Sequence, residues 1–203
     1  MDRATLRAYR SSQQRIRRDV AAIAAVFAGT LVVTVLACPP LLAYALLCLT
    51  GFAGTFLLGA VRPTLGGAPA LRDAPLGVLA AAVSLGAGLL LVLLAGAPFE
   101  GWHLPAAALL LESALLPAVV EEWLCRGVLW TACLRLQPLR VTLVVTAMLF
   151  TLMHVLAWGP FGIPAHFVAG LAFGAVRART GSLPPCMLAH LLHNGVVLGF
   201  APP

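Results

Sequence analysis

Lysine is absent from the 203-residue sequence, and charged residues of all kinds make up only 10% of it. Ordinary soluble domains are about one quarter charged, because polar groups must cover their surface. Hydrophobic residues instead account for 61% of this chain, and the mean hydropathy is +0.99. The composition excludes an ordinary soluble domain and indicates that lipid surrounds most of the protein.

Long apolar runs recur along the whole chain, and each is about as long as a membrane-spanning helix. Such a helix needs about 20 apolar residues to cross the hydrocarbon layer. The sequence therefore predicts an all-α fold, a polytopic bundle of about seven transmembrane helices within one membrane domain, residues 1–203. We expect the spans near residues 20–38, 41–60, 76–97, 105–127, 141–158, 163–178 and 183–200.

The basic residues predict how this bundle is oriented. All thirteen are arginines, and only Arg126 lies well inside a predicted span. The others are Arg3, Arg7, Arg10, Arg15, Arg17, Arg18, Arg62, Arg72, Arg135, Arg140, Arg177 and Arg179. If the N-terminus is cytoplasmic, all of these lie on the cytoplasmic side, as the positive-inside rule requires. The net charge of +6 then reflects topology, and we expect no nucleic-acid partner.

Within the domain we distinguish three parts: a basic cytoplasmic segment (1–19), the first three spans (20–97) and a core of four spans (105–200). The first three spans contain no charged residue, so we expect the chemistry to belong to the core. The five cysteines form no C-x-x-C pair and lie in or beside apolar runs. They are interpreted as small packing residues rather than disulfides or metal ligands.

Two adjacent glutamates, Glu121 and Glu122, lie in the fourth span. Ionisable groups are costly in lipid and usually mark a functional cavity. Glu122 and Arg126 are four residues apart and share a helix face, whereas Glu121 points about 100° away. Arg126 can thus neutralise one carboxylate and leave the other free as a general base. A purely structural Glu122–Arg126 pair is an equally good interpretation of those two residues, but it leaves Glu121 unexplained.

The last span carries His190 and Asn194 on one face, with His193 nearby. Imidazole and amide N–H groups that converge on one point can stabilise an oxyanion. Hydrogen bonds that merely bridge helices are the alternative, and they are also the simpler interpretation of His154 in the fifth span. His166 is expected at an outer helix end and is treated as background.

No metal or other cofactor is predicted. The H-E-x-x-H motif of zinc proteases is absent. Three histidines and a glutamate could still meet from separate helices, as they do in the cores of some bundles. A zinc-dependent protease therefore stays an alternative. A close helix contact is expected at Gly170 and Gly174, which form a G-x-x-x-G pattern.

Three motifs occur in order within the predicted core: E-E-x-x-x-R at residues 121–126, F-x-x-x-H at 150–154 and H-x-x-x-N at 190–194. Their order and spacing resemble the CAAX protease and bacteriocin-processing family, also called ABI, of glutamic-type intramembrane proteases. The stretch 170–194 is also similar to that family, and the resemblance covers about residues 105–200.

The resemblance implies a metal-free proteolytic mechanism. Glu121 would activate a water molecule, with His154 helping to hold it. His190 and Asn194 would stabilise the tetrahedral oxyanion. The residues expected to support this site are Glu122, Arg126, Phe150 and His193.

The resemblance leaves the substrate class open. Relatives trim prenylated C-termini, process bacteriocin precursors or act as immunity proteins, and a further set resembles sorting proteases such as myxosortases. The arginine-only basic set and the Ala/Leu/Val-rich composition indicate a GC-rich bacterium. We therefore expect processing of a membrane-embedded or lipid-anchored substrate, a sorting tail or a precursor peptide, in a bacterial plasma membrane. Two non-proteolytic functions also stay open, namely a non-catalytic immunity or scaffold protein and an ion-relay protein.

Overall fold

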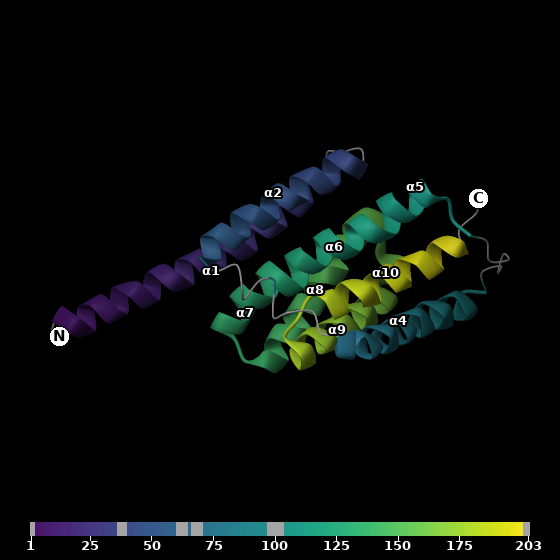
Figure 1. Cartoon of the computed structure of the whole chain (residues 1–203). Coiled ribbons are helices and arrows are strands. Elements are labelled where there is room, and N and C mark those ends of the chain that lie inside the picture. The colour runs from purple at the N-terminus through teal and green to yellow at the C-terminus, as the bar shows by residue number, and fades with distance from the viewer. Residues whose placement is uncertain (1–2, 36–39, 60–64, 66–70, 97–103, 201–203) are drawn as a thin grey trace.

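The computed structural model describes residues 3–35, 40–59, 65, 71–96 and 104–200, and all regular structure in them is helical. Seven helical segments are present within these ranges (Figure 1). They are α1 (Arg3–Val35), α2 (Pro40–Leu58), α4 (Ala74–Leu94), a composite helix over residues 107–136, α8 (Leu139–Trp158), α9 (Ile163–Thr180) and α10 (Pro184–Gly199). The all-α prediction is confirmed, and each helix overlaps one of the predicted spans.

Two of the described helices, Ala74–Leu94 and Pro160–Thr180, are long and apolar enough to cross a membrane, by length and composition. Shorter apolar helices cover Leu42–Leu58 and Leu139–Val155. Large apolar side chains face outward on several helices; Phe56 is 85% exposed and Leu94 is 77% exposed. An apolar surface of this kind is expected where lipid is the solvent. The full set of seven spans and the cytoplasmic N-terminus stay predictions.

The basic N-terminal segment is helical and continuous with the first predicted span. Together they form α1, whose 33 residues extend over about 50 Å at 1.5 Å per residue. Its N-terminal half projects beyond the bundle, while its C-terminal half lies beside α2 (Figure 1). The two helices approach closely at Gly29, where any side chain would collide with Thr50.

The G-x-x-x-G prediction in α9 is confirmed by its packing against α8. A Cβ atom at Gly170 would lie 3.0 Å from the Cα atom of Ala147, and one at Gly174 would lie 2.6 Å from a methyl carbon of Leu143. Both glycines are buried. The absence of side chains there allows α8 and α9 to pack with their backbones in near contact.

The composite helix that carries the two glutamates widens into a π-helix twice. It runs through α5 (Ala107–Leu110), a π-helical stretch (Leu111–Leu115), α6 (Leu116–Glu122), a second π-helical stretch (Trp123–Leu129) and α7 (Trp130–Leu136). Pro117 accounts for the first widening, because a proline has no N–H to donate and its ring clashes with the preceding turn. The second widening begins directly after Glu122.

This helix also forms the centre of the packing. Leu124, Val128 and Leu129 are fully buried in the apolar core. The α1, α2, α8 and α10 helices pack around successive parts of it. Cys48, Cys125, Cys133 and Cys186 are free thiols, and all but Cys48 are buried. Cys38 lies outside the described residues. The two glutamates therefore lie on a helix that packs against four other helices of the bundle.

Candidate active site

Polar side chains from five helices meet where α6 passes into the second π-helical stretch. The composite helix supplies the two glutamates and an arginine, while α4, α8, α9 and α10 supply the rest. The members of this cluster are Ser84, Glu121, Glu122, Arg126, His154, His166, His190 and His193. Sequences far apart in the chain are thus brought into one buried polar region.

Glu122 and Arg126 form the ion pair that their spacing predicted. Arg126 Nη1 donates to Glu122 Oε1 at 2.9 Å, and both side chains have zero exposure. Arg126 Nη2 also donates to the carbonyl oxygen of Gly170 at 2.9 Å. The Nδ1 atom of His190 lies 3.0 Å from the same Glu122 Oε1. The Glu122–Arg126 pair therefore links the composite helix to α9 through Arg126 and to α10 through Glu122.

Two phenylalanines enclose this ion pair. The Arg126 guanidinium carbon lies 4.5 Å from the ring centre of Phe150 and 5.6 Å from that of Phe173. His190 stacks on Phe173 with ring centres 5.3 Å apart. Aromatic faces stabilise a desolvated cation, and the effect reaches about 2 kcal/mol in a buried setting. Phe150 was predicted from its motif, whereas Phe173 was not.

Glu121 lies apart from that pair and faces His154. The Oε2 atom of Glu121 is 3.5 Å from His154 Nε2, and the two side chains are 16% and 14% exposed. His154 Nδ1 lies 2.8 Å from the Phe150 carbonyl oxygen and must donate to it, because a carbonyl only accepts. Glu121 Oε2 is buried and has no hydrogen-bond partner in the described part of the chain. The adjacent glutamates thus have different environments, as the helix geometry predicted.

His166, which sequence analysis had treated as background, is part of the cluster. Its ring centre lies 4.5 Å from that of His154, with an interplanar angle of 32°. Like His154, it directs Nδ1 to the carbonyl four residues earlier, that of Gly162, at 2.8 Å. The sequence signal was available: His154 lies near the end of one predicted span and His166 near the start of the next, across a short loop. Helices joined in this way place their facing ends side by side.

Ser84 is a second residue that sequence analysis missed, because α4 was expected to carry no chemistry. Its side chain has zero exposure, and Ser84 Oγ lies 2.9 Å from His193 Nδ1. Ser84 donates its hydroxyl proton to the Ala81 carbonyl at 3.0 Å, so it accepts a proton from His193 Nδ1. The ring of His193 is therefore oriented by a helix outside the predicted core.

Asn194 lies on α10 one turn after His190, as predicted, and is partly buried. Within the described chain its side chain makes no hydrogen bond to the cluster. In the same ranges, no group of three or more His, Cys, Asp and Glu side chains is placed to hold a metal ion. The absence of a metal from the reaction stays a prediction.

An apolar helical bundle that buries two glutamates, an arginine and several histidines has the features of an enzyme that works inside a membrane. Comparison with protein families narrows the class of enzyme. Residues 102–196 match the family described as Type II CAAX prenyl endopeptidase Rce1-like. The match covers 95 of the 203 residues, so this part of the chain is similar to the Rce1-like endopeptidases, and it indicates a glutamic-type intramembrane protease.

The matched residues include every member of the cluster except Ser84. No curated protein and no solved structure matched the chain. The resemblance seen in the three motifs is confirmed for the family domain, and the myxosortase subtype stays a proposal.

Proposed function

We propose that the protein hydrolyses a peptide bond of a membrane-associated substrate, with Glu121 as the base that activates water. One observation carries this assignment: Glu121 Oε2 is buried without a hydrogen-bond partner in the described residues, 3.5 Å from His154 Nε2. A buried carboxylate oxygen without a partner is costly unless water or a substrate occupies the space beside it.

The neighbouring carboxylate, that of Glu122, already has two hydrogen-bond partners. Glu122 is neutralised by Arg126 and also accepts a hydrogen bond from His190, so it is poorly suited to abstract a proton. Glu121 has no such cation in hydrogen-bond contact among the described residues. We therefore assign catalysis to Glu121, and we assign positioning of the cluster to Glu122 and Arg126.

His154 supports the assignment of the water site. Because its Nδ1 proton goes to the Phe150 carbonyl, its Nε2 atom is an acceptor when the ring is neutral. Ionised Glu121 and neutral His154 then present two acceptors side by side, which can hold the two hydrogens of one water molecule. Glu121 takes one proton as the water oxygen bonds to the scissile carbonyl carbon. It returns that proton to the amine nitrogen as the carbon–nitrogen bond breaks.

The hydrogen bond of His190 to Glu122 limits how His190 can bind the oxyanion. Its Nδ1–H donates to Glu122, so only a doubly protonated ring has a second N–H on Nε2 for the oxyanion. The amide of Asn194, one turn along α10, is proposed as the second donor. Each donor of this kind contributes about 10²–10³ in rate.

We propose a bacterial sorting or peptide-processing role in the plasma membrane, with a membrane-embedded or lipid-anchored substrate. All basic residues are arginine, and the composition is rich in Ala, Leu and Val. Both features are typical of proteins from GC-rich genomes and support a bacterial origin. A myxosortase-like specificity for a C-terminal sorting tail is the finer form of this proposal. The burial of Glu121 among apolar helices supports a substrate that enters from lipid rather than from water.

Glu121→Gln tests the base assignment directly. Wild type and variant are reconstituted in proteoliposomes with a panel of single-span and lipid-anchored reporter peptides, and cleavage is followed at saturating enzyme. We expect a loss of about 10²–10⁴ in rate, the usual contribution of a general base. Glu112→Gln is the matched control, because it makes the same change on the same composite helix outside the cluster. Cleavage by Glu121→Gln at the wild-type rate would refute the assignment.

A further inference from the structure

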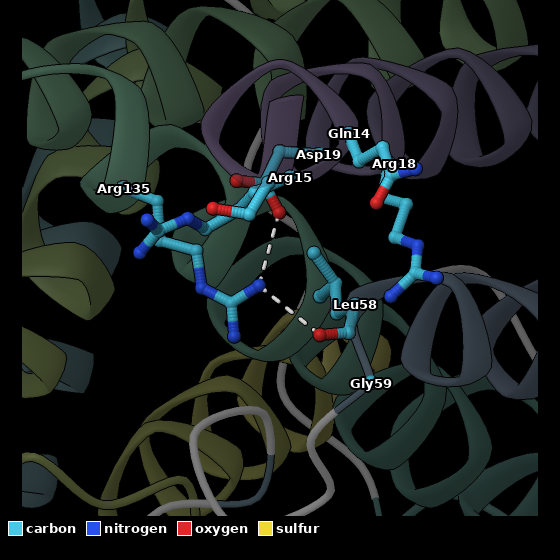
Figure 2. A pocket seen from close by; sticks show the side chains of 8 residues that line it. Gln14, Arg15, Arg18, Asp19, Leu58, Gly59 and Arg135 are labelled. Atoms are coloured by element: carbon cyan, nitrogen blue, oxygen red, sulfur yellow. Dashed lines mark hydrogen bonds and ion pairs between the residues drawn. The ribbon is translucent and has the colours of Figure 1, made fainter. Parts of the chain in front are cut away.

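A cavity of about 410 Å³ lies at the end of the bundle where α1 meets the C-terminal ends of α2 and α7 (Figure 2). Its volume is within the range of small-molecule sites. The polar residues that define its chemistry are Gln14, Arg15, Arg18, Asp19 and Arg135. It lies on different elements from the glutamate–histidine cluster, apart from the composite helix that both share.

One side of the cavity is a fixed ion pair. Arg135 Nη1 donates to Asp19 Oδ1 at 3.0 Å and to the carbonyl oxygen of Leu58 at 3.1 Å (Figure 2). The Asp19 side chain has zero exposure, and that of Arg135 is 28% exposed. Because α2 ends at Leu58, this carbonyl lacks an intrahelical partner. Arg135, near the end of α7, thus connects the middle of α1 to the end of α2, and its charge is compensated by Asp19.

Two further cations remain. Arg15 and Arg18 are exposed, lie three residues apart on α1 and line the same cavity. Neither has an acidic partner among the described residues. Since Arg135 and Asp19 compensate each other, these two arginines give the cavity a net positive charge. Arginine side chains favour a phosphate group, which can accept several of their N–H donors.

Asp19 adds a second requirement. Its Oδ2 atom is buried and has no hydrogen-bond partner in the described ranges, whereas Oδ1 is bound by Arg135. A buried acceptor without a partner calls for a donor such as a hydroxyl. The cavity therefore suits a ligand that combines an anionic phosphate with a hydroxyl group a few bonds away.

The position along α1 identifies the source of such a ligand. Asp19 is the last charged residue before the apolar run that begins at Val20, and Val20 is 52% exposed. The cavity is thus placed where a membrane helix would pass from lipid to headgroups. Basic pockets between helices at this depth bind anionic phospholipid headgroups.

We propose that this cavity binds the headgroup of an anionic phospholipid, with its phosphodiester at Arg15 and Arg18 and a headgroup hydroxyl at Asp19. The site does not depend on the proteolytic mechanism. It would attach the N-terminal helix to the bundle through a lipid, in addition to the direct Arg135 contacts.

The full chain in neutral detergent provides the test. Its unfolding temperature is followed while short-chain phosphatidylglycerol, short-chain phosphatidylcholine or inorganic phosphate is added, and an apparent affinity is taken from each series. We expect phosphatidylglycerol alone to raise the unfolding temperature. Arg15→Gln and Arg18→Gln should each weaken its apparent affinity about fivefold, since one interfacial arginine contributes about that much.

Arg17→Gln is the matched control. Arg17 is exposed, has the same charge and adjoins Arg18, but points about 100° away from it and does not line the cavity. Its substitution should leave the affinity unchanged. An equal loss in Arg17→Gln would mean diffuse surface attraction and overturn the site. Equal stabilisation by phosphatidylcholine would also overturn it, and equal stabilisation by inorganic phosphate would replace the lipid with a free anion.

Discussion

The buried ion pair leads to a prediction that separates the two adjacent glutamates. Glu122→Gln removes the only negative charge in contact with Arg126 among the described residues, and the Arg126 side chain has zero exposure. Glu121→Gln removes a carboxylate that has no hydrogen-bond partner within the described chain. Glu122→Gln should therefore lower stability, whereas Glu121→Gln should lower activity and leave stability nearly unchanged.

The size of the first effect follows from burial. Removing one partner of a buried ion pair costs about 3–5 kcal/mol, because the other charge stays desolvated without compensation. The loss includes the His190 contact to the same carboxylate oxygen, at 3.0 Å. For a chain of this length, 1 kcal/mol corresponds to a shift of about 2–4 °C in unfolding temperature. We therefore expect Glu122→Gln to unfold about 10 °C below wild type.

Thermal unfolding followed by tryptophan fluorescence in one detergent measures these differences. A double variant, Glu122→Gln with Arg126→Gln, completes the cycle, because replacing both partners leaves no isolated charge. It should unfold at a higher temperature than Glu122→Gln alone. If Glu122→Gln unfolds at the wild-type temperature, or if the double variant unfolds at a lower temperature than Glu122→Gln, the ion pair does not stabilise the fold in this way.

Three further predictions follow from other contacts. Ser84→Ala should cost about 1–3 kcal/mol, because the partly buried ring of His193 loses its hydrogen-bond partner, and chemical unfolding will measure this; unchanged stability would contradict the expected effect. Gly170→Ala places a Cβ atom 3.0 Å from the Cα atom of Ala147 and should cost about 1–3 kcal/mol. Gly195→Ala, with no neighbouring atom within 4 Å, is its control and should be neutral or slightly stabilising. Proteolysis should continue after treatment with a strong chelator, and a loss of activity restored by Zn²⁺ would refute the metal-free mechanism.

Features that depend on local spacing could be predicted from the sequence. The apolar runs located the helices, because length and hydropathy suffice to define such segments. The Glu122–Arg126 pair followed from a separation of four residues, and the G-x-x-x-G contact from the size of two glycines. Each of these features is contained within a single helix or its surface.

Features that depend on how helices cross could not be predicted in the same way. Ser84 and His193 are 109 residues apart and belong to helices whose relative position no local pattern specifies. Residue counting along regular helices does not bring Glu121 and His154 to the same depth in the membrane. The structure brings Glu121 Oε2 to 3.5 Å from His154 Nε2 on α8, and the helix that carries Glu121 has a π-helical stretch before it, which regular counting does not include.

The continuity of α1 across the proposed headgroup cavity has a practical consequence for labelling experiments. The helix has no break between its exposed N-terminal half and the part that packs on α2, so it can serve as a rigid arm. A spin label at Tyr9, which is 58% exposed, would stand roughly 15 Å along the helix axis from Asp19. Its depth relative to a membrane surface would report the tilt of the whole bundle without disturbing either polar site.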